Sequence, residues 1–331
     1  MRVLGGDIGG TTTRLGLFEV EANGLDLIAE QTFSSPDYPG LEEVVSEFLA
    51  GRAGTGLVAC FGIAGPVAGR RMRTTNLPWV VDADLVEERA GIAKVTILND
   101  LEATAWGLPL VGDEDLRVLN PGREGAAGNG AVIAAGTGLG EAGVYWDGER
   151  YHPFACEGGH ASFAPTDELT DGLARFLREK YGGVSWERVV SGPGLADLYR
   201  FMLEREGRPQ PAWFSEAVES GDPAAALSKA GIEGRCEVCA DALKLFARLY
   251  GEEAGNLALK LMAAGGVWVA GGVAPKILPA LESGAFMEGF LAKGRMRPLL
   301  EAMPVRVVLD ERTALLGAAS RAEFSILNSQ F

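Results

Sequence analysis

Residues 3–20 constrain the fold of this chain more than any other part of its sequence. They read VLGGDIGGTTTRLGLFEV, a short apolar run followed by a glycine-dense turn and a run that alternates apolar and polar side chains. This pattern predicts a strand, a tight loop and a second strand. Gly9 and Gly10 carry no Cβ, so backbone N–H groups of the turn can approach a ligand closely. Successive N–H groups in such a turn bind anions such as phosphate.

The polar residues of this turn decide between two interpretations. One is an ordinary glycine hairpin with a surface acid. The other is a phosphate-binding loop, and it is favoured by Asp7, by the threonines at 11–13 and by Arg14 behind them. A carboxylate beside phosphates usually faces their metal ion, directly or through water. The turn therefore predicts phosphate binding, with Asp7 close to a magnesium ion.

A second glycine loop repeats this design later in the chain. Residues 131–140 read AVIAAGTGLG, and residues 142–146 continue as a strand. Two such hairpins suggest an internal duplication with one phosphate loop in each half. A Rossmann fingerprint fits poorly, because Glu141 stands where its third glycine belongs and a strand pattern follows instead of a helix. The chain contains no Gly-Lys pair, which excludes a Walker A loop.

Asn99 and Asp100 follow a predicted buried strand and precede a helical pattern at 101–106. Ligands of open α/β sheets bind at the carboxyl ends of strands, and a carboxylate there can act as a general base. The alternative role is a helix cap. The two roles are compatible.

Residues 156–163, CEGGHASF, place Glu157 and His160 on either side of a glycine pair. A carboxylate and an imidazole presented together suit the recognition of hydroxyl groups, since one accepts and the other can donate hydrogen bonds. A metal site is the rival interpretation, but two isolated histidines without a cysteine or aspartate cluster argue against it. His152 is expected to be an ordinary surface residue in a turn. Glu187, taken alone, is expected to be a surface acid.

The rest of the chain sets the expected boundaries. Residues 113–129 are expected to form polar loop and turn, and the lobe boundary is placed near residue 110. Residues 239–264 predict a long helix, and a buried strand at 266–270 ends in Gly271 and Gly272. A glycine pair at a strand end admits a flat ring close to the backbone.

Composition limits the class of partner. The chain has 331 residues and a formal net charge of −15, which disfavours a nucleic-acid surface or an anionic membrane surface. The first strand begins at Val3 with no apolar leader before it, and no stretch is long enough for a membrane span. Four cysteines in a chain of this length indicate no disulfide framework, which is consistent with a reducing, cytoplasmic setting. Cys236 and Cys239 are expected to be a structural pair of small residues.

Six motifs together resemble the bacterial glucokinases of the hexokinase-related superfamily, in the class without the cysteine-rich zinc motif. They lie in order along nearly the whole chain, at residues 6–11, 98–100, 136–140, 157–160, 187–194 and 270–272. One departure is Thr12, where this loop often carries Asn. The resemblance implies an α/β, two-lobed actin-like or ribonuclease H-like ATPase fold with the active-site cleft between the lobes. The small α/β lobe is expected at 1–110 plus 312–331 and the larger α+β lobe at 111–311.

The same resemblance implies a role for each motif. The implied reaction transfers the γ-phosphate of ATP to the 6-hydroxyl of glucose as the entry step of glycolysis, with Asp100 as the base. Asn99, Glu157, His160 and Glu187 would hold the other sugar hydroxyls, and Asp7 would lie near Mg²⁺. The residues implied for the nucleotide are Gly6, Asp7, Ile8, Gly9, Gly10, Thr11, Gly136, Thr137, Gly138, Gly271 and Gly272. A cytoplasmic homodimer is implied as well, with no nucleic-acid or membrane partner.

Two other classes of function remain as alternatives. A sugar-responsive regulator would need a DNA-binding head, for which the chain offers no room before Val3 and the wrong charge. A nucleotide-driven chaperone or filament protein would not need Glu157, His160 and Glu187. The sequence leaves open the choice among glucose, mannose and glucosamine, and whether ADP or polyphosphate replaces ATP.

Overall fold

The computed structural model of the chain describes residues 1–331 except 22–23, 53–55, 66, 68, 75–76 and 328–331. Its residues divide into two compact units, Met1–Gly112 with Asp310–Phe331, and Asp113–Leu309. The last four residues of the expected 312–331 segment lie outside the described residues. No described helix is both long and apolar enough to cross a membrane.

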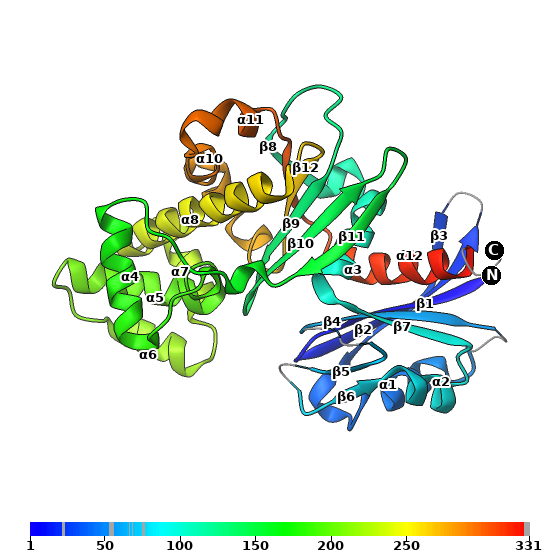
Figure 1. Cartoon of the computed structure of the whole chain (residues 1–331). Helices are drawn as coiled ribbons and strands as arrows, with labels where there is room; N and C mark the ends of the chain where they lie inside the picture. The colour runs from blue at the N-terminus through cyan, green and yellow to red at the C-terminus, as the bar shows by residue number, and fades with distance from the viewer. Residues whose placement is uncertain (22–23, 53–55, 66, 68, 75–76, 328–331) are drawn as a thin grey trace. The chain divides into compact units, whose positions relative to one another are not determined.

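The first unit is built on a five-stranded sheet in the order β3-β2-β1-β4-β7 (Figure 1). Its strands are β1 (Arg2–Ile8), β2 (Thr12–Glu21), β3 (Gly24–Ser34), β4 (Val58–Ile63) and β7 (Lys94–Asn99), with a separate β5 (Arg71–Arg73) and β6 (Val80–Asp82) ribbon. Its helices are α1 (Leu41–Leu49), α2 (Ala83–Ala90), α3 (Asp100–Gly107) and α12 (Thr313–Leu327).

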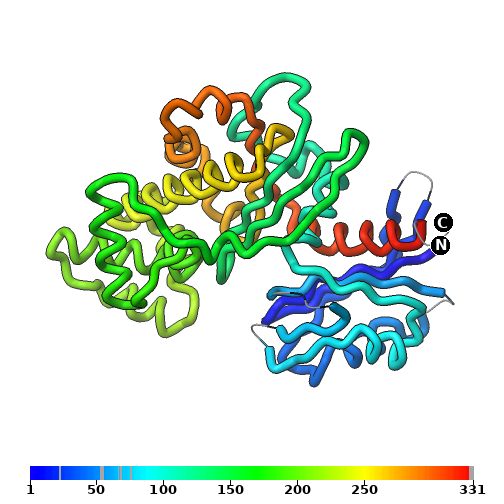
Figure 2. The backbone as a smooth tube through the Cα atoms, viewed as in Figure 1, coloured from blue at the N-terminus to red at the C-terminus, as the bar shows by residue number. Residues whose placement is uncertain are grey.

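Helices bury both faces of this first sheet. One core cluster joins the sheet to α1 and α2, and a second joins its other face to α3 and α12. In Figure 2 the C-terminal helix, in red, runs beside the N-terminal strand, in blue. The approach is close: a Cβ on Gly317 would come 1.8 Å from the Ala103 carbonyl oxygen, and one on Gly107 would come 2.0 Å from that of Thr313. The glycines are therefore what allows α3 and α12 to cross.

The second unit repeats this sheet topology. Its six-stranded sheet has the order β11-β10-β9-β12-β13-β8. Its strands are β8 (Leu116–Asn120), β9 (Gly130–Ala135), β10 (Leu139–Trp146), β11 (Tyr151–Cys156), β12 (Gly266–Ala270) and β13 (Val305–Val308). In both sheets three antiparallel strands formed by consecutive hairpins are extended by two parallel strands. This shared topology supports the internal duplication inferred from the two glycine loops.

Helices of the second unit gather around one long helix. They are α4 (Glu168–Tyr181), α5 (Gly192–Arg205), α6 (Ala212–Glu219), α7 (Pro223–Ile232), α8 (Glu237–Leu261), α9 (Leu278–Glu282), α10 (Ala285–Leu291) and α11 (Arg297–Glu301). The Tyr250 hydroxyl, on α8, donates to a backbone carbonyl of β9 or β12 and accepts from the Ala135 N–H at 3.0 Å. The helix is thereby fixed to the two central strands that carry the glycine loops.

Two local expectations are wrong. Residues 113–129 are not all loop, because β8 lies within them and pairs antiparallel with β13. It is an edge strand held by that pairing, and Val118 remains 52% exposed, so no buried alternation marks it in the sequence. His152 is not in a turn either: it lies in β11, where its Nε2 contacts the Asp147 carboxylate at 2.5 Å.

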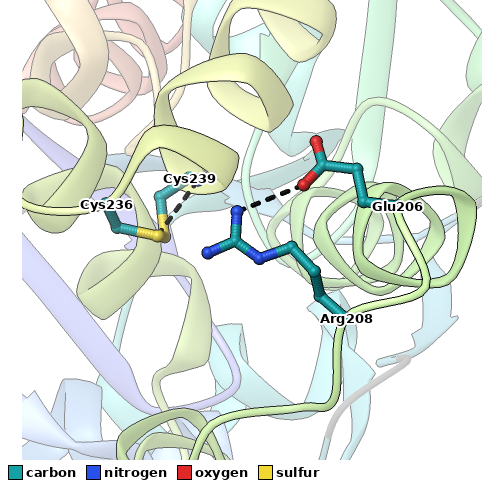
Figure 3. The surroundings of a disulfide bond; sticks show 4 residues. All are labelled: Glu206, Arg208, Cys236 and Cys239. Atoms are coloured by element: carbon teal, nitrogen blue, oxygen red, sulfur yellow. Dashed lines mark hydrogen bonds and ion pairs between the residues drawn. A yellow bond between two sulfur atoms is a disulfide. The ribbon is translucent and has the colours of Figure 1, made fainter.

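The structure also joins Cys236 and Cys239 in a disulfide at the start of α8, which the sequence analysis did not anticipate (Figure 3). Cys236 is the N-cap of the helix, and its Sγ accepts a hydrogen bond from the Cys239 N–H at 3.2 Å. The pair packs close to α7, since a Cβ on Gly231 would come 3.0 Å from the Cys239 backbone.

We expect Cys236→Ser to cost little stability. The disulfide closes a loop of only residues 236–239, and the loop-entropy relation gives at most about 2 kcal/mol for so short a ring. The serine hydroxyl can still cap α8. Urea unfolding of Cys236→Ser, compared with the unreduced and the reduced wild type, measures the difference. Two results would contradict this account. One is a free energy of unfolding of Cys236→Ser that lies more than about 4 kcal/mol below that of the wild type. The other is a loss in Cys236→Ser that reduction of the wild type does not reproduce.

Candidate functional site

The functional residues predicted in the first unit lie at one edge of its sheet. Strands β1, β4 and β7 are parallel neighbours, and Ile8, Ile63 and Asn99 share one register position near their carboxyl ends. The 9–11 loop follows β1, and Asp100 follows β7. Topology therefore brings the first glycine loop and Asp100 to the edge where α/β sheets bind ligands.

The first glycine loop is fixed by a residue that the sequence analysis did not single out. Ser35 is fully buried; its hydroxyl donates to the Gly9 carbonyl at 2.9 Å, and its N–H donates to the Thr11 carbonyl at 3.0 Å. The Gly9 N–H donates to Thr12 across the turn at 2.9 Å. No local pattern indicates this role of Ser35, because two strands, β2 and β3, separate it from the loop in the sequence.

The other predicted residues of this loop lie differently. Gly6 packs into the sheet, since a Cβ there would come 2.5 Å from the Phe61 ring. Ile8 is 2% exposed and belongs to the core, whereas Gly10 and Thr11 lie nearer the surface.

Asp7 has an unusual electrostatic setting. Its pKa is raised to about 6, chiefly by burial and also by the neighbouring Asp100 carboxylate, while Arg14 opposes the shift. Arg14 stands opposite Asp7 in the β1–β2 pairing. Two carboxyl groups close enough to repel one another are a setting that a cation would relieve.

Asn99 and Asp100 form the start of α3. The Asn99 Oδ1 accepts from the Leu101 N–H at 2.9 Å and its Nδ2 donates to the Gly65 carbonyl at 3.1 Å. Asp100 Oδ1 also accepts from the Leu101 N–H at 2.9 Å. Asn99 is thus the helix cap, and the carboxylate of Asp100 lies in the first turn, where the helix dipole favours negative charge.

The glycine loops of the second unit also lie side by side. Strands β9 and β12 are parallel neighbours, so residues 136–138 and 271–272 follow strand ends at the same edge. The Gly271 backbone has a φ of +83°, and a Cβ there would come 2.6 Å from the Ala135 carbonyl oxygen. Only glycine suits that position. The Gly136 carbonyl accepts from the Gly192 N–H at 2.8 Å, which brings the start of α5 to this loop.

Three predicted side chains of the second unit converge. The His160 Nε2 lies 3.9 Å from a Glu157 carboxylate oxygen, and its Nδ1 lies 3.9 Å from one of Glu187. The second oxygen of Glu187 accepts from the Leu139 N–H at 3.1 Å. Glu187 is therefore no isolated surface acid, since it touches both the second glycine loop and the histidine.

The 157–160 turn owes its shape to two glycines packed against β10. A Cβ on Gly159 would come 2.0 Å from the Leu139 carbonyl oxygen, and one on Gly158 would come 1.8 Å from a Glu141 carboxylate oxygen. A side chain at position 159 would require the backbone to move, and one at position 158 would displace the Glu141 carboxyl group. Glu157 and His160 remain about 60% exposed, so both can reach a ligand.

A cavity of about 670 Å³ opens beside the second glycine loop. Three residues that the sequence analysis predicts to bind the nucleotide line it: Gly136, Thr137 and Gly272. Other lining residues were not predicted as site residues: Gly192, Pro193, Asp197, Arg200, Ala224, Ser228, Val273 and Lys276. The sequence Ser191-Gly192-Pro193 indicates a helix start, because a capping serine is followed by Pro in the first turn. That pattern could have pointed to the start of α5 as part of the cavity. No pattern in the sequence predicts that α7 forms one wall of this cavity.

Asn99 and Asp100 belong to the first unit, whereas Glu157, His160 and Glu187 belong to the second. Among the described residues, no group of three or more His, Cys, Asp or Glu side chains could hold a metal ion by itself. A divalent ion at Asp7 would need further ligands from its substrate, as magnesium in phosphoryl-transfer enzymes has.

The chain is similar to known proteins over nearly its whole length. The family model described as "Glucokinase" matches residues 4–324. A glucokinase of Synechocystis sp. is 42% identical over 96% of both chains. The crystal structure of a glucokinase from an Antarctic psychrotroph has a TM-score of 0.84 and 30% identity, covering 98% of this chain and 99% of that one. A ROK family glucokinase from Streptomyces griseus, solved with glucose and AMPPNP, shares the fold at a TM-score of 0.65 and 23% identity over 98% of this chain and all of that one.

Proposed function

The chain belongs to the glucokinase family and phosphorylates glucose with ATP on the actin-like ATPase fold, and from this premise we propose which residues do so. The convergence of Glu157, His160 and Glu187 within 4 Å in the second unit is the observation that carries the proposal. Two carboxylates and an imidazole offer acceptors and a donor to a ring of hydroxyl groups. We assign them, with Asn99, to the sugar.

Asp100 is the general base in this proposal. It accepts the proton of the glucose 6-hydroxyl as that oxygen attacks the γ-phosphorus of ATP, and ADP leaves. The helix dipole at the start of α3 favours its ionised form. Phosphoryl transfer otherwise needs positioning and charge stabilisation more than covalent chemistry.

The phosphates are assigned to the two glycine loops. The 9–11 loop is fixed by Ser35 and the 136–138 loop by Gly192. Their remaining backbone N–H groups would bind the anion. Mg²⁺ would be held near Asp7, directly or through water, and would neutralise charge developing on the phosphates. The repulsion between Asp7 and Asp100 supports a cation there.

The adenosine is assigned to the cavity beside Gly272. Its volume suits a nucleoside, and its walls join the start of α5, α7 and the 271–273 segment. A flat ring can lie on the glycine backbone at 271–272, as the sequence predicts.

This assignment gives a steric prediction. A Cβ on Gly272 would meet nothing within 4 Å, so Gly272→Val should fold normally while narrowing the cavity. Overpacking costs about 1–3 kcal/mol, so we expect the KM for ATP to rise about tenfold with the KM for glucose unchanged. Gly183→Val is the matched control, because its Cβ also meets nothing within 4 Å and it does not line the cavity. Equal KM values for ATP in the two variants would contradict the assignment of the adenosine to this cavity.

One experiment tests the proposal as a whole. ADP release is measured across a panel of hexoses and of phosphate donors, with and without Mg²⁺. We expect turnover to require glucose, ATP and Mg²⁺ together. Release of ADP without any sugar would favour a chaperone-like ATPase instead, and turnover that persists in excess chelator would remove the metal from the mechanism.

We also propose that the enzyme works in the cytoplasm, at the entry to glycolysis, as a homodimer. Its use of ATP supports the compartment, and the family resemblance supports the dimer. Light scattering on the purified protein tests the assembly, and a mass equal to one chain of 34.9 kDa would refute it.

A further inference from the structure

The cavity beside the second glycine loop has a charged wall, to which the proposed mechanism gives no role. Its residues are Lys180 on α4 and Asp197 and Arg200 on α5. Asp197 is 1% exposed, and its Oδ1 accepts from the Lys180 ammonium at 2.7 Å and from the Arg200 guanidinium at 2.8 Å. Its Oδ2 accepts from the Tyr181 hydroxyl at 2.6 Å. The buried carboxylate thus holds two cations at the cavity.

Both cations keep hydrogen-bond donors for a ligand. An ammonium group has three N–H donors and a guanidinium group has five, so the bonds to Asp197 leave others over. The side chains of Lys180 and Arg200 are 43% and 32% exposed. Arg200 is restrained further, since its guanidinium carbon lies 5.2 Å from the centre of the Phe214 ring. The two cations are therefore held in position and are still accessible from the cavity.

The direction of α5 relates the charged wall to the second glycine loop. The helix begins at Gly192, whose N–H donates to the Gly136 carbonyl of that loop at 2.8 Å. With a rise of 1.5 Å per residue, Asp197 lies about 7 Å and Arg200 about 12 Å further along the helix axis. The phosphates are assigned to the loop, and in a nucleotide the ribose separates the base from the phosphates. The charged wall therefore lies toward the base.

The chemistry of the charged wall suits a purine base. The ring nitrogens of adenine, N7 among them, accept hydrogen bonds, and Lys and Arg side chains donate to such acceptors when proteins read bases. We propose that Lys180 and Arg200, held by Asp197, bind the adenine base of ATP. The inference rests on the proposed assignment of the adenosine to this cavity.

Two other roles of the charged wall make different predictions. Cations that act on the phosphates through their charge would strengthen the binding of ATP but not of adenosine, because adenosine carries no charge. Ion pairs that only join α4 to α5 would affect neither ligand in a variant that is folded. A base-binding role affects both ligands, so adenosine is the probe that separates the three.

Inhibition of the whole enzyme by adenosine, in competition with ATP, tests the inference in Lys180→Met and Arg200→Met. Methionine keeps an unbranched side chain, and in each variant Asp197 retains the other cation. Loss of one hydrogen bond from a charged donor is expected to raise the adenosine inhibition constant and the KM for ATP about tenfold each. We expect the KM for glucose to stay unchanged, and thermal unfolding checks that each variant is folded.

Lys229→Met and Arg205→Met are the matched controls. Lys229 is exposed on α7, which contributes to the wall of the cavity, and Arg205 is exposed on α5, the helix of Arg200. Neither residue lines the cavity. Each control removes the same charge from the same unit, so we expect both to keep the wild-type constants for adenosine and ATP.

The outcomes separate this inference from the proposed function. A rise in the KM for ATP without a rise in the adenosine inhibition constant would assign the cations to the phosphates and overturn the inference. Unchanged constants in both variants, or a wild type that adenosine does not inhibit, would overturn it as well. Gly272→Val is measured alongside. An unchanged KM for ATP there refutes the adenosine assignment itself, whereas a rise there alone refutes only the role of Lys180 and Arg200.

Discussion

Asp100→Asn is expected to lower kcat by about 10²–10⁴ while glucose binding stays within about threefold of the wild type. The amide cannot take a proton from the 6-hydroxyl. It has nearly the same shape, and its oxygen can still accept from the Leu101 N–H, so the start of α3 is preserved. The loss therefore falls on the chemical step and not on the fold.

Three measurements check this prediction. ADP release gives kcat, calorimetry gives the glucose dissociation constant, and thermal unfolding shows whether the variant is intact. Asp84→Asn is the matched control, because Asp84 also lies in the first turn of a helix of the same unit and its carboxylate forms a surface ion pair with Arg70. A kcat within tenfold of the wild type would remove Asp100 as the base.

The second large effect is expected at the two glutamates that we assign to the sugar. Glu157→Gln and Glu187→Gln should each weaken glucose binding about 10- to 150-fold, since a hydrogen bond to a charged acceptor contributes about 1.5–3 kcal/mol. The amide oxygen at position 187 can still accept from the Leu139 N–H, which keeps the second glycine loop in place. The KM for ATP is therefore expected to stay within about threefold.

Glu179→Gln on the exposed face of α4 serves as the control for a change of charge alone. Calorimetry with glucose and, separately, with an unreactive ATP analogue distinguishes the two ligands. Equal losses for both ligands would mean that Glu157 and Glu187 support the fold and not the sugar. Glu187→Ala, which removes the contact with Leu139, is expected to weaken both ligands.

The sequence predicted features whose cause is local. The glycine loops, the cap at Asn99 and the strand ends that carry them follow from short patterns of residue type, and the structure has them where expected. The Glu157–His160 turn could also be foreseen, since its two glycines and two polar residues are consecutive. The parallel strands then bring these loops to common edges.

Features that depend on distant register could not be foreseen. The Glu187 carboxylate reaches the Leu139 N–H and His160 only through the packing of distant segments, and no local pattern contains that information. The same holds for Ser35 beneath the first glycine loop and for the α7 wall of the cavity. Strand β8 lacks a buried side, so only its pairing with β13 reveals it.

Helix α12 belongs to the first unit although residues 113–309 of the second unit precede it in the chain. Without it, only α3 covers one face of the five-stranded sheet, and the close-packing surfaces at Gly5 and Gly107 have nothing to meet. While the ribosome extends the chain, the second unit can complete its core before α12 has been made. The unit that is synthesised first is thus the last to finish folding. Until α12 has been made, the apolar sheet face against which it packs stays exposed on the nascent chain, where cellular chaperones can bind it.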